Sequence, residues 1–200
     1  MKKILLLSFS LSAYYAHAQD SLRSPRLGVI TSVSTMAAGL MPPSIHVGPS
    51  FTWGKHQAYI TAFLVNSIYD IKGTYPGIGA GYHFYPNGAD TRFSLLFSYD
   101  FEYFSAKPEV ALTGPPDLPI AWGRPVIEIE NYLGFGFRLN IIKNLFLTTS
   151  VGFGAGMVKE RMYYRYSDGR IDYWGMNFDE PFALNGKLSL TYSFLKLKHK

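Results

Sequence analysis

Four acidic residues at alternate positions are the side chains best placed for chemistry in this sequence. Asp100 and Glu102 lie in one apolar stretch, and Glu128 and Glu130 lie in the next. Residues two apart point to the same side of a β-strand, so each pair would share one face. If the two strands are neighbours, the four carboxylates form one cluster. Their repulsion must then be offset by basic side chains, by a bound cation or by a shared proton.

The pairing of the two stretches follows from the segment that joins them, Ser105–Pro125, which is rich in proline. Strands joined by one loop pair antiparallel, and a register centred on this loop sets Asp100 opposite Glu130 and Glu102 opposite Glu128. Like charges directly opposite each other destabilise a sheet. At about 5 Å and an effective dielectric constant near 20, each pair would repel by about 3 kcal/mol.

Basic side chains are the compensation that we favour for this repulsion. Arg138 and Lys187 lie at alternating positions that point to the same side of their strands as the carboxylates, here called the inward parity. Arg124 or Arg161 could reach in from the outer end of the strands. A bound cation and a shared proton stay open as alternatives. The predicted charge cluster consists of Asp100, Glu102, Glu128, Glu130, Arg138 and Lys187.

The other reactive residue types show no spacing typical of a catalytic or metal site. His46, His56, His83 and His199 are not spaced as metal ligands with each other or with a carboxylate. No G-x-S-x-G motif is present. Cysteine is absent, which excludes a disulfide framework and a thiolate nucleophile. We therefore predict no catalytic residue, no metal ligand and no cofactor.

The carboxylates belong to long stretches in which large apolar residues alternate with small or charged ones. The clearest are the two halves of Val126–Val158, which break at Asn140–Asn144. A period of two indicates strands. Each half has about a dozen residues, more than the five or six usual in globular strands. The length suits a tilted strand that crosses a bilayer.

The composition of the two faces indicates which face meets which environment. One face of Val126–Val158 carries Leu, Phe, Ile and Val, and the other carries Gly, Ser, Thr and charged residues. An eight-stranded barrel has an interior only wide enough for side chains, which the bulky face would overfill. Apolar residues outside and polar residues inside are typical of a transmembrane β-barrel. A soluble lipocalin-like barrel is the alternative.

The whole chain after its first residues follows the same pattern, and we predict an all-β fold, an antiparallel eight-stranded up-and-down barrel. The longer connections follow the first, third, fifth and seventh strands, which is the asymmetry of an outer-membrane barrel with long external loops. These connections are Ala37–Ser44, Asn66–Thr74, Ser105–Pro125 and Glu160–Pro181. The predicted strands are Leu27–Met36, Ile45–Trp53, Gln57–Val65, Tyr75–Tyr85, Arg92–Phe104, Val126–Leu139, Leu145–Val158 and Phe182–Phe194.

The chain begins with a predicted secretory signal, Met1–Ala18, which has a basic start, an apolar middle and an A-x-A cleavage site. Residues 19–200 would then form the barrel domain. Removing the two lysines of the signal lowers the formal net charge from +5 to +3. That charge is too small to indicate a nucleic-acid partner.

The signal, the eight strands and the aromatic last strand Leu188–Phe194 resemble small outer-membrane β-barrels of the OmpA/OmpX type. The resemblance covers nearly all of residues 19–200 and depends on pattern rather than on a specific motif. It implies a bacterial outer-membrane location, insertion by the barrel-insertion machinery, contact with membrane lipid and lipopolysaccharide, and a monomer. One departure is the basic tail Leu195–Lys200, because such barrels commonly end at an aromatic residue.

The last connection, Glu160–Pro181, is rich in tyrosine, tryptophan and arginine, which are favoured at recognition surfaces. Ser167–Arg170 is predicted as a two-residue hairpin turn, which sets Leu145 opposite Tyr192 and extends the strands beyond the membrane. The plainer interpretation of this composition is an aromatic belt at the membrane–water interface, or ordinary loop structure. The candidate surface contacts are Tyr164, Arg165, Tyr166, Arg170, Tyr173 and Trp174.

The function that we expect is structural or adhesive, through long loops exposed at the cell surface. Three alternatives stay open. They are a narrow porin-like pore, a lipid A-modifying enzyme with a serine and a histidine at the barrel rim, and a soluble ligand carrier.

Overall fold

The structure is a computed structural model that describes residues 25–36, 43–68, 71–113 and 118–197. The predicted signal, Met1–Ala18, lies outside the described residues. Within them, no helix is long and apolar enough to cross a membrane.

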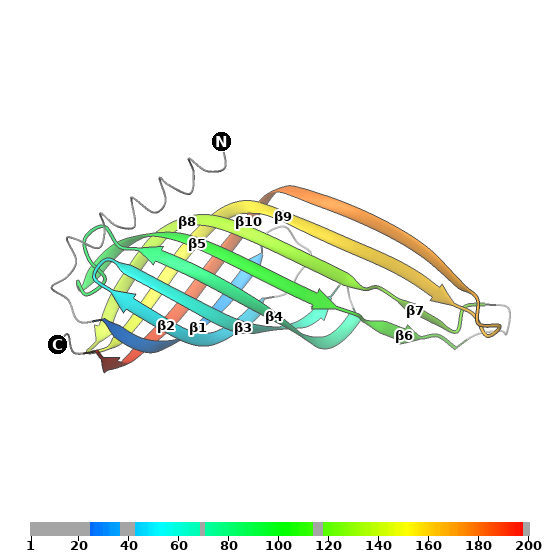
Figure 1. Cartoon of the computed structure of the whole chain (residues 1–200), viewed down its shortest axis with the longest axis horizontal. Helices are drawn as coiled ribbons and strands as arrows, with labels where there is room; N and C mark the ends of the chain where they lie inside the picture. The colour runs from blue at the N-terminus through cyan, green and yellow to red at the C-terminus, as the bar shows by residue number, and fades with distance from the viewer. Residues whose placement is uncertain (1–24, 37–42, 69–70, 114–117, 198–200) are drawn as a thin grey trace.

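Eight long strands make up most of the described chain (Figure 1). Two short strands, β6 (Glu109–Ala111) and β7 (Ala121–Gly123), lie between the fifth and sixth of them. The long strands are β1 (Arg26–Met36), β2 (Ser44–Trp53), β3 (His56–Ile68), β4 (Ile71–Phe84), β5 (Phe93–Ala106), β8 (Val126–Ile142), β9 (Leu145–Arg165) and β10 (Ile171–Lys196).

The eight long strands form a closed antiparallel barrel. Their order is β10-β1-β2-β3-β4-β5-β8-β9, and β9 pairs again with β10, so the sheet returns on itself. All of these pairings are antiparallel. Closure pairs the backbone groups that an open sheet would leave at its edges. The predicted fold class, an all-β eight-stranded up-and-down barrel, is confirmed.

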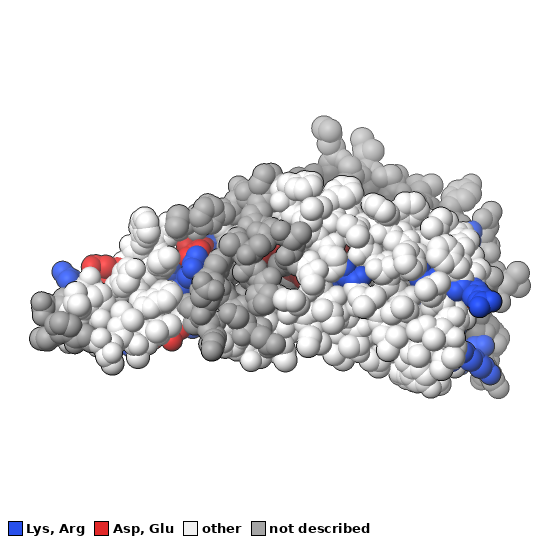
Figure 2. All heavy atoms as spheres, turned by 180° about the vertical axis from the view of Figure 1, so that it is seen from behind, with Lys and Arg blue, Asp and Glu red and all other residues white. Residues whose placement is uncertain are grey.

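The two faces of the wall have the predicted polarity. Along β5 the side chains alternate between exposed and buried, beginning with Phe93 outside and Ser94 inside. On β8, Leu133 and Phe135 are 59% and 61% exposed, whereas the inward Arg138 is completely buried. Figure 2 shows one side of the barrel wall as largely uncharged. The barrel therefore has an apolar exterior and a polar, charged interior.

Short turns close one end of the barrel. Gly54 and Lys55 join β2 to β3, and Gly54 has φ 53°. Glycine at the first position of a two-residue turn matches the twist of the flanking strands. The turn between β8 and β9 ends at Asn144, with φ 71°. His56 is the first residue of β3.

The opposite end differs from the prediction because the strands continue into the expected loops. The prediction of Asn66–Thr74 as a long loop is wrong, since residues 66–68 belong to β3 and residues 71–74 to β4. The prediction of Ser105–Pro125 as a loop is wrong for residues 105–106, β6 and β7, which are strands. Ala106 pairs with Val126 and Glu109 with Gly123, so β6 and β7 continue the β5–β8 hairpin without a register shift.

The β9–β10 hairpin is the longest element, with strands of 21 and 26 residues. Its turn has three residues rather than the predicted two, because Tyr166 N–H donates to Arg170 O and Gly169 takes φ 83°. A bulge at residues 181–182 of β10 offsets the difference. Leu145 consequently lies opposite Tyr192, as predicted.

Beyond the barrel, β6, β7, the end of β9 and the start of β10 form one four-stranded sheet, called the projecting sheet here (Figure 1). It comprises β6, β7, residues 161–165 of β9 and residues 171–175 of β10. It continues the barrel wall on the side of β5, β8, β9 and β10 only. The strands β1 to β4 have no counterpart in it among the residues that the structure describes.

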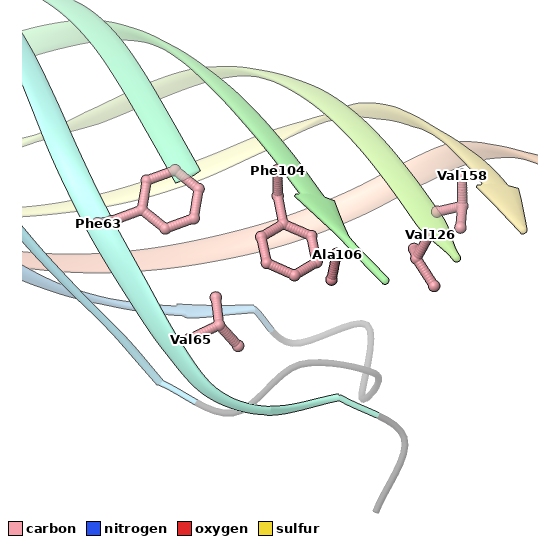
Figure 3. Packing of buried hydrophobic residues seen from close by; sticks show 6 residues of the cluster. All are labelled: Phe63, Val65, Phe104, Ala106, Val126 and Val158. Atoms are coloured by element: carbon pink, nitrogen blue, oxygen red, sulfur yellow. The ribbon is translucent and has the colours of Figure 1, made fainter. Parts of the chain in front are cut away.

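Two apolar clusters occupy the ends of the barrel interior. The outer cluster lies below the projecting sheet, with inward side chains from β3, β5, β8 and β9 (Figure 3). Its members are Phe63, Val65, Phe104, Ala106, Val126 and Val158. A smaller cluster of Tyr85, Ala89 and Leu96 lies at the end with the short turns. The polar interior lies between these two clusters.

Candidate functional site

The centre of the lumen holds a buried ion pair between strands that are not neighbours. Lys187 on β10 places Nζ 2.8 Å from Asp100 Oδ1 and 3.5 Å from Glu102 Oε1, both on β5. All three side chains are at most 6% exposed. Strands β8 and β9 separate β5 from β10 in the sheet, so the lysine reaches across the interior. One ammonium group thus contacts two carboxylates in the barrel interior.

A chain of hydrogen bonds extends from this ion pair toward the end with the short turns. The Tyr59 hydroxyl donates to Asp100 and lies 3.3 Å from His83 Nε2. The other ring nitrogen of His83 lies 3.1 Å from the Tyr85 hydroxyl, which donates to Gln57 Oε1 at 2.7 Å. Buried polar groups need such partners, because an unpaired one keeps its desolvation cost.

Arg138 lies at the far end of this chain, away from the carboxylates. Its guanidinium donates to Gln57 Oε1 at 3.4 Å and stacks 3.8 Å from the centre of the Phe146 ring. The ring of Tyr85 is 5.0 Å away. Arg138 is completely buried, so the cation is held by aromatic faces and an amide rather than by a carboxylate.

The predicted register of the carboxylates is wrong by two residues. Glu102 lies opposite Glu130, and Asp100 lies opposite Tyr132. The error arises because β5 continues two residues beyond the predicted Phe104, to Ala106, whereas β8 begins at Val126 as predicted, which moves the centre of the hairpin by one residue.

The corrected register places one like-charge pair next to the central ion pair. Glu102 and Glu130 are 3% and 2% exposed on adjacent strands. Among the described residues, Glu130 Oε2 and the Tyr132 hydroxyl have no hydrogen-bond partner. Glu128 lies further out, opposite Phe104 and Val158 of the outer apolar cluster.

The structure therefore keeps the four predicted carboxylates and Lys187 in one part of the lumen and separates Arg138 from them. Asp100, Glu102 and Lys187 are in contact, and Glu130 is the cross-strand neighbour of Glu102. Of the predicted compensating arginines, Arg124 forms an ion pair with Glu160. Arg161 stacks 4.3 Å from the centre of the Tyr173 ring, outside the lumen.

Sequence reasoning missed several members of the interior network. Gln57 and Tyr59 lie two residues apart on β3, and His83 on β4 is two residues before Tyr85, which directly follows that strand. His46 on β2 lies 3.9 Å from Glu102 and 2.7 Å from Ser44 Oγ. The alternation along these strands marks which side chains face inward, and this was the available signal. It does not show which inward side chains meet across the lumen.

The interior network joins side chains from several strands of the wall. No group of three or more histidine and acidic side chains among the described residues is arranged to hold a metal ion. The network connects titratable groups into a chain that crosses between strands β2, β3, β4, β5 and β10. Side chains from most of the wall thus meet in one buried cluster, which resists collapse of the barrel.

The outer face of the projecting sheet is polar and internally paired. Glu109 on β6 accepts a hydrogen bond from the Tyr163 hydroxyl at 2.7 Å and one from Arg165 at 2.6 Å. Tyr163 also approaches Tyr173, with ring centres 6.2 Å apart. The bond to the Glu109 carboxylate, more than the slight burial, raises the pKa of Tyr163. A partner would gain little from these already paired groups.

The inner face of the projecting sheet is rich in aromatic and apolar residues and also carries Asp172 and Arg170. One row across it pairs Val110 with Trp122, Trp122 with Tyr164, and Tyr164 with Asp172. The next row pairs Met162 with Trp174. These residues continue the rows of side chains that face the lumen on β8 and β9. The exposed apolar and aromatic members of this face include Leu112, Ile120, Tyr164 and Trp174, at 37%, 40%, 38% and 64%.

The predicted surface residues divide between the two faces of the sheet. Tyr164 and Trp174 belong to the inner face, where Arg170 also stacks 4.2 Å from the centre of the Tyr166 ring. Arg165 and Tyr173 belong to the outer face. Sequence reasoning did not include Trp122, because it lies in the segment that was expected to be a loop.

Comparisons with known proteins give a structural likeness. No protein-family model matches the chain, and no curated protein matches it. Among solved structures, the chain is similar to the crystal structure of a major outer membrane protein from Thermus thermophilus. The sequence identity is 10%, the TM-score is 0.48, and the match covers 85% of this chain and 99% of that chain.

Proposed function

We propose that this chain is an integral β-barrel protein of a bacterial outer membrane, of the small eight-stranded type, with a structural or adhesive role at the cell surface. The reversed polarity of the barrel carries the proposal. Phe135 and Leu133 are more than half exposed on the outside, whereas Asp100, Glu102 and Lys187 are buried inside. Soluble monomers rarely expose such a continuous apolar surface, which a bilayer would cover.

The orientation follows from the two ends of the barrel. The short turns at residues 54–55 and 143–144 suit the periplasmic side, and the projecting sheet suits the exterior. Lys159 and Arg161 are exposed just beyond Met157 of the apolar wall. Cations at this height would contact lipopolysaccharide phosphates. Tyr192 and Phe194, outward-facing near the end of β10, support recognition by the barrel-insertion machinery.

A surface role is favoured over conduction because the lumen is filled. Lys187 and the tyrosine–histidine chain occupy its centre, and an apolar cluster lies toward each end. Eight strands leave an interior only wide enough for side chains. Planar-bilayer recording of the purified protein should therefore show no steady conductance.

Three observations test the proposal. The protein should fractionate with outer membranes, and its electrophoretic band should shift on heating in detergent. A cysteine at Asp168 should react with an impermeant maleimide on intact cells, whereas cysteines at Asn87 and Asn144 should react only after the outer membrane is opened. Labelling of Asn87→Cys but not Asp168→Cys on intact cells would reverse the orientation. Recovery in a soluble fraction would reject the membrane location.

A further inference from the structure

The end of the barrel with the short turns is strongly basic. Among the described residues it carries one acidic side chain, Asp90, and that carboxylate is paired with Arg26. Basic side chains outnumber it five to one, which gives a formal charge of +4. Figure 2 shows blue atoms and no red atoms at this end, on the right of the view. The basic residues are Arg26, Lys55, Arg92, Lys143 and Lys196.

Three of these cations lie along one arc of the rim, called the basic arc here. Arg92 precedes β5, Lys143 lies in the turn between β8 and β9, and Lys196 ends β10. The strands β5, β8, β9 and β10 are neighbours in the sheet, so at about 4.8 Å spacing the arc spans about 14 Å. All three side chains are exposed, and within the described residues none of them forms an ion pair.

The position of the basic arc relative to the apolar wall favours a membrane surface over a soluble partner. Each of its cations is the direct chain neighbour of an exposed apolar side chain. These side chains are Phe93, Ile142 and Leu195, at 48%, 63% and 46%. The charges therefore begin where the apolar wall ends, which is the height of the lipid phosphates in a bilayer. Lysine and arginine can lay their apolar stems along such a wall while the charged group reaches the headgroups.

We propose that the basic arc binds the phosphates of anionic phospholipids in the adjoining leaflet of the membrane. This inference rests on the proposed outer-membrane location, in which the end with the short turns meets the periplasmic leaflet. A headgroup such as phosphatidylglycerol offers its phosphate without the cation that neutralises a phosphatidylcholine headgroup. The attraction of each lysine or arginine to an anionic lipid surface corresponds to about a fivefold gain in association.

A titration followed by the backbone amide signals in NMR spectra tests this inference. The folded protein in phosphocholine micelles is titrated with phosphatidylglycerol, and in parallel with phosphatidylcholine and with glycerol 3-phosphate. The amide signals of Arg92, Lys143 and Lys196 should shift and saturate with phosphatidylglycerol alone. Glycerol 3-phosphate carries the same phosphate without a lipid anchor, so an equal response to it would make a soluble anion the partner.

Lys143 and Arg170 provide matched variants, because both are exposed cations in the connections at the two ends of β9. Lys143→Gln should weaken the apparent affinity for phosphatidylglycerol about fivefold. Lys143→Arg, which keeps the charge, and Arg170→Gln, at the far end of the projecting sheet, should stay within twofold of the original protein. Glutamine at all three positions of the basic arc should weaken the affinity at least tenfold. The heat-shifted band verifies that each variant is folded.

Three results would overturn the inference. They are no saturable shift with phosphatidylglycerol, an equal response to phosphatidylcholine or glycerol 3-phosphate, and equal losses of affinity in Lys143→Gln and Arg170→Gln. The outcome is separate from that of the proposed function. If Asp168→Cys labels on intact cells but phosphatidylglycerol leaves the signals of the basic arc unchanged, the membrane location stands and the lipid site is excluded.

Discussion

Lys187 on β10 donates a 2.8 Å hydrogen bond to Asp100 on β5, across two intervening strands of the barrel wall. Because both side chains are almost completely buried, neither charge can be compensated by bulk solvent. Removing one partner from such a pair leaves an uncompensated buried charge, which costs more than the pair contributes. The contact therefore connects distant parts of the wall.

The first prediction concerns this ion pair. Lys187→Met should lower the free energy of unfolding in detergent micelles by about 3–5 kcal/mol, because Asp100 and Glu102 lose their cation. Adding Asp100→Asn to Lys187→Met should recover part of the loss. Urea titration followed by tryptophan fluorescence measures both values. If the loss of unfolding free energy in the double variant equals the sum of the losses in the two single variants, the two side chains are not coupled.

The second prediction concerns the like-charge pair. Glu102→Gln and Glu130→Gln should have non-additive effects on the free energy of unfolding, because either change relieves the same repulsion. The expected coupling energy is about 1–3 kcal/mol. Glu102→Gln combined with Glu160→Gln is the control, since Glu160 is paired with Arg124. Additivity within about 0.5 kcal/mol for the Glu102–Glu130 pair would contradict the register of β5 and β8.

The third prediction concerns the lipid-facing wall. Leu133, 59% exposed at the middle of β8, should not tolerate a charge, and Leu133→Arg should cost about 2–4 kcal/mol near the bilayer midplane. Leu118, 52% exposed beyond the barrel, is the control, and Leu118→Arg should change stability by less than about 0.5 kcal/mol. Folding assays in lipid vesicles compare the two. Equal tolerance at both positions would mean that β8 does not face lipid.

The fourth prediction is a pH dependence in the projecting sheet. The Glu109 carboxylate raises the pKa of Tyr163 above the ordinary tyrosine value of 10.0. The hydrogen bond thus stabilises the sheet below about pH 10, and its contribution is lost as the pH rises through the higher folded-state value. Ultraviolet titration of the phenols, taken as the difference between the original protein and Tyr163→Phe, should show that Tyr163 titrates late and that Glu109→Gln returns it to the ordinary range. An unchanged titration in Glu109→Gln would show that this bond is absent.

The sequence by itself determined the fold class and the polarity of the wall. Alternation of Phe, Leu and Val with small or charged residues fixes which side of each strand is inward, because the period of a strand is two. For this reason the inward positions of Asp100, Glu102, Glu128 and Glu130 were predicted correctly. The register of β9 and β10 at Leu145 and Tyr192 was also predicted, although a turn of different length and a bulge together produce it.

The tertiary structure alone decided which inward side chains meet. The alternation of side chains does not define how far one strand is shifted along its neighbour. The structure sets this register, and it places Glu102 rather than Asp100 opposite Glu130. The alternation also does not define contacts across the lumen, which depend on barrel closure and place Lys187 against Asp100 but Arg138 against Phe146. The segment around Trp122 reads as a proline-rich loop because its strands are only three residues long, and it forms strands because β9 offers a long edge for pairing.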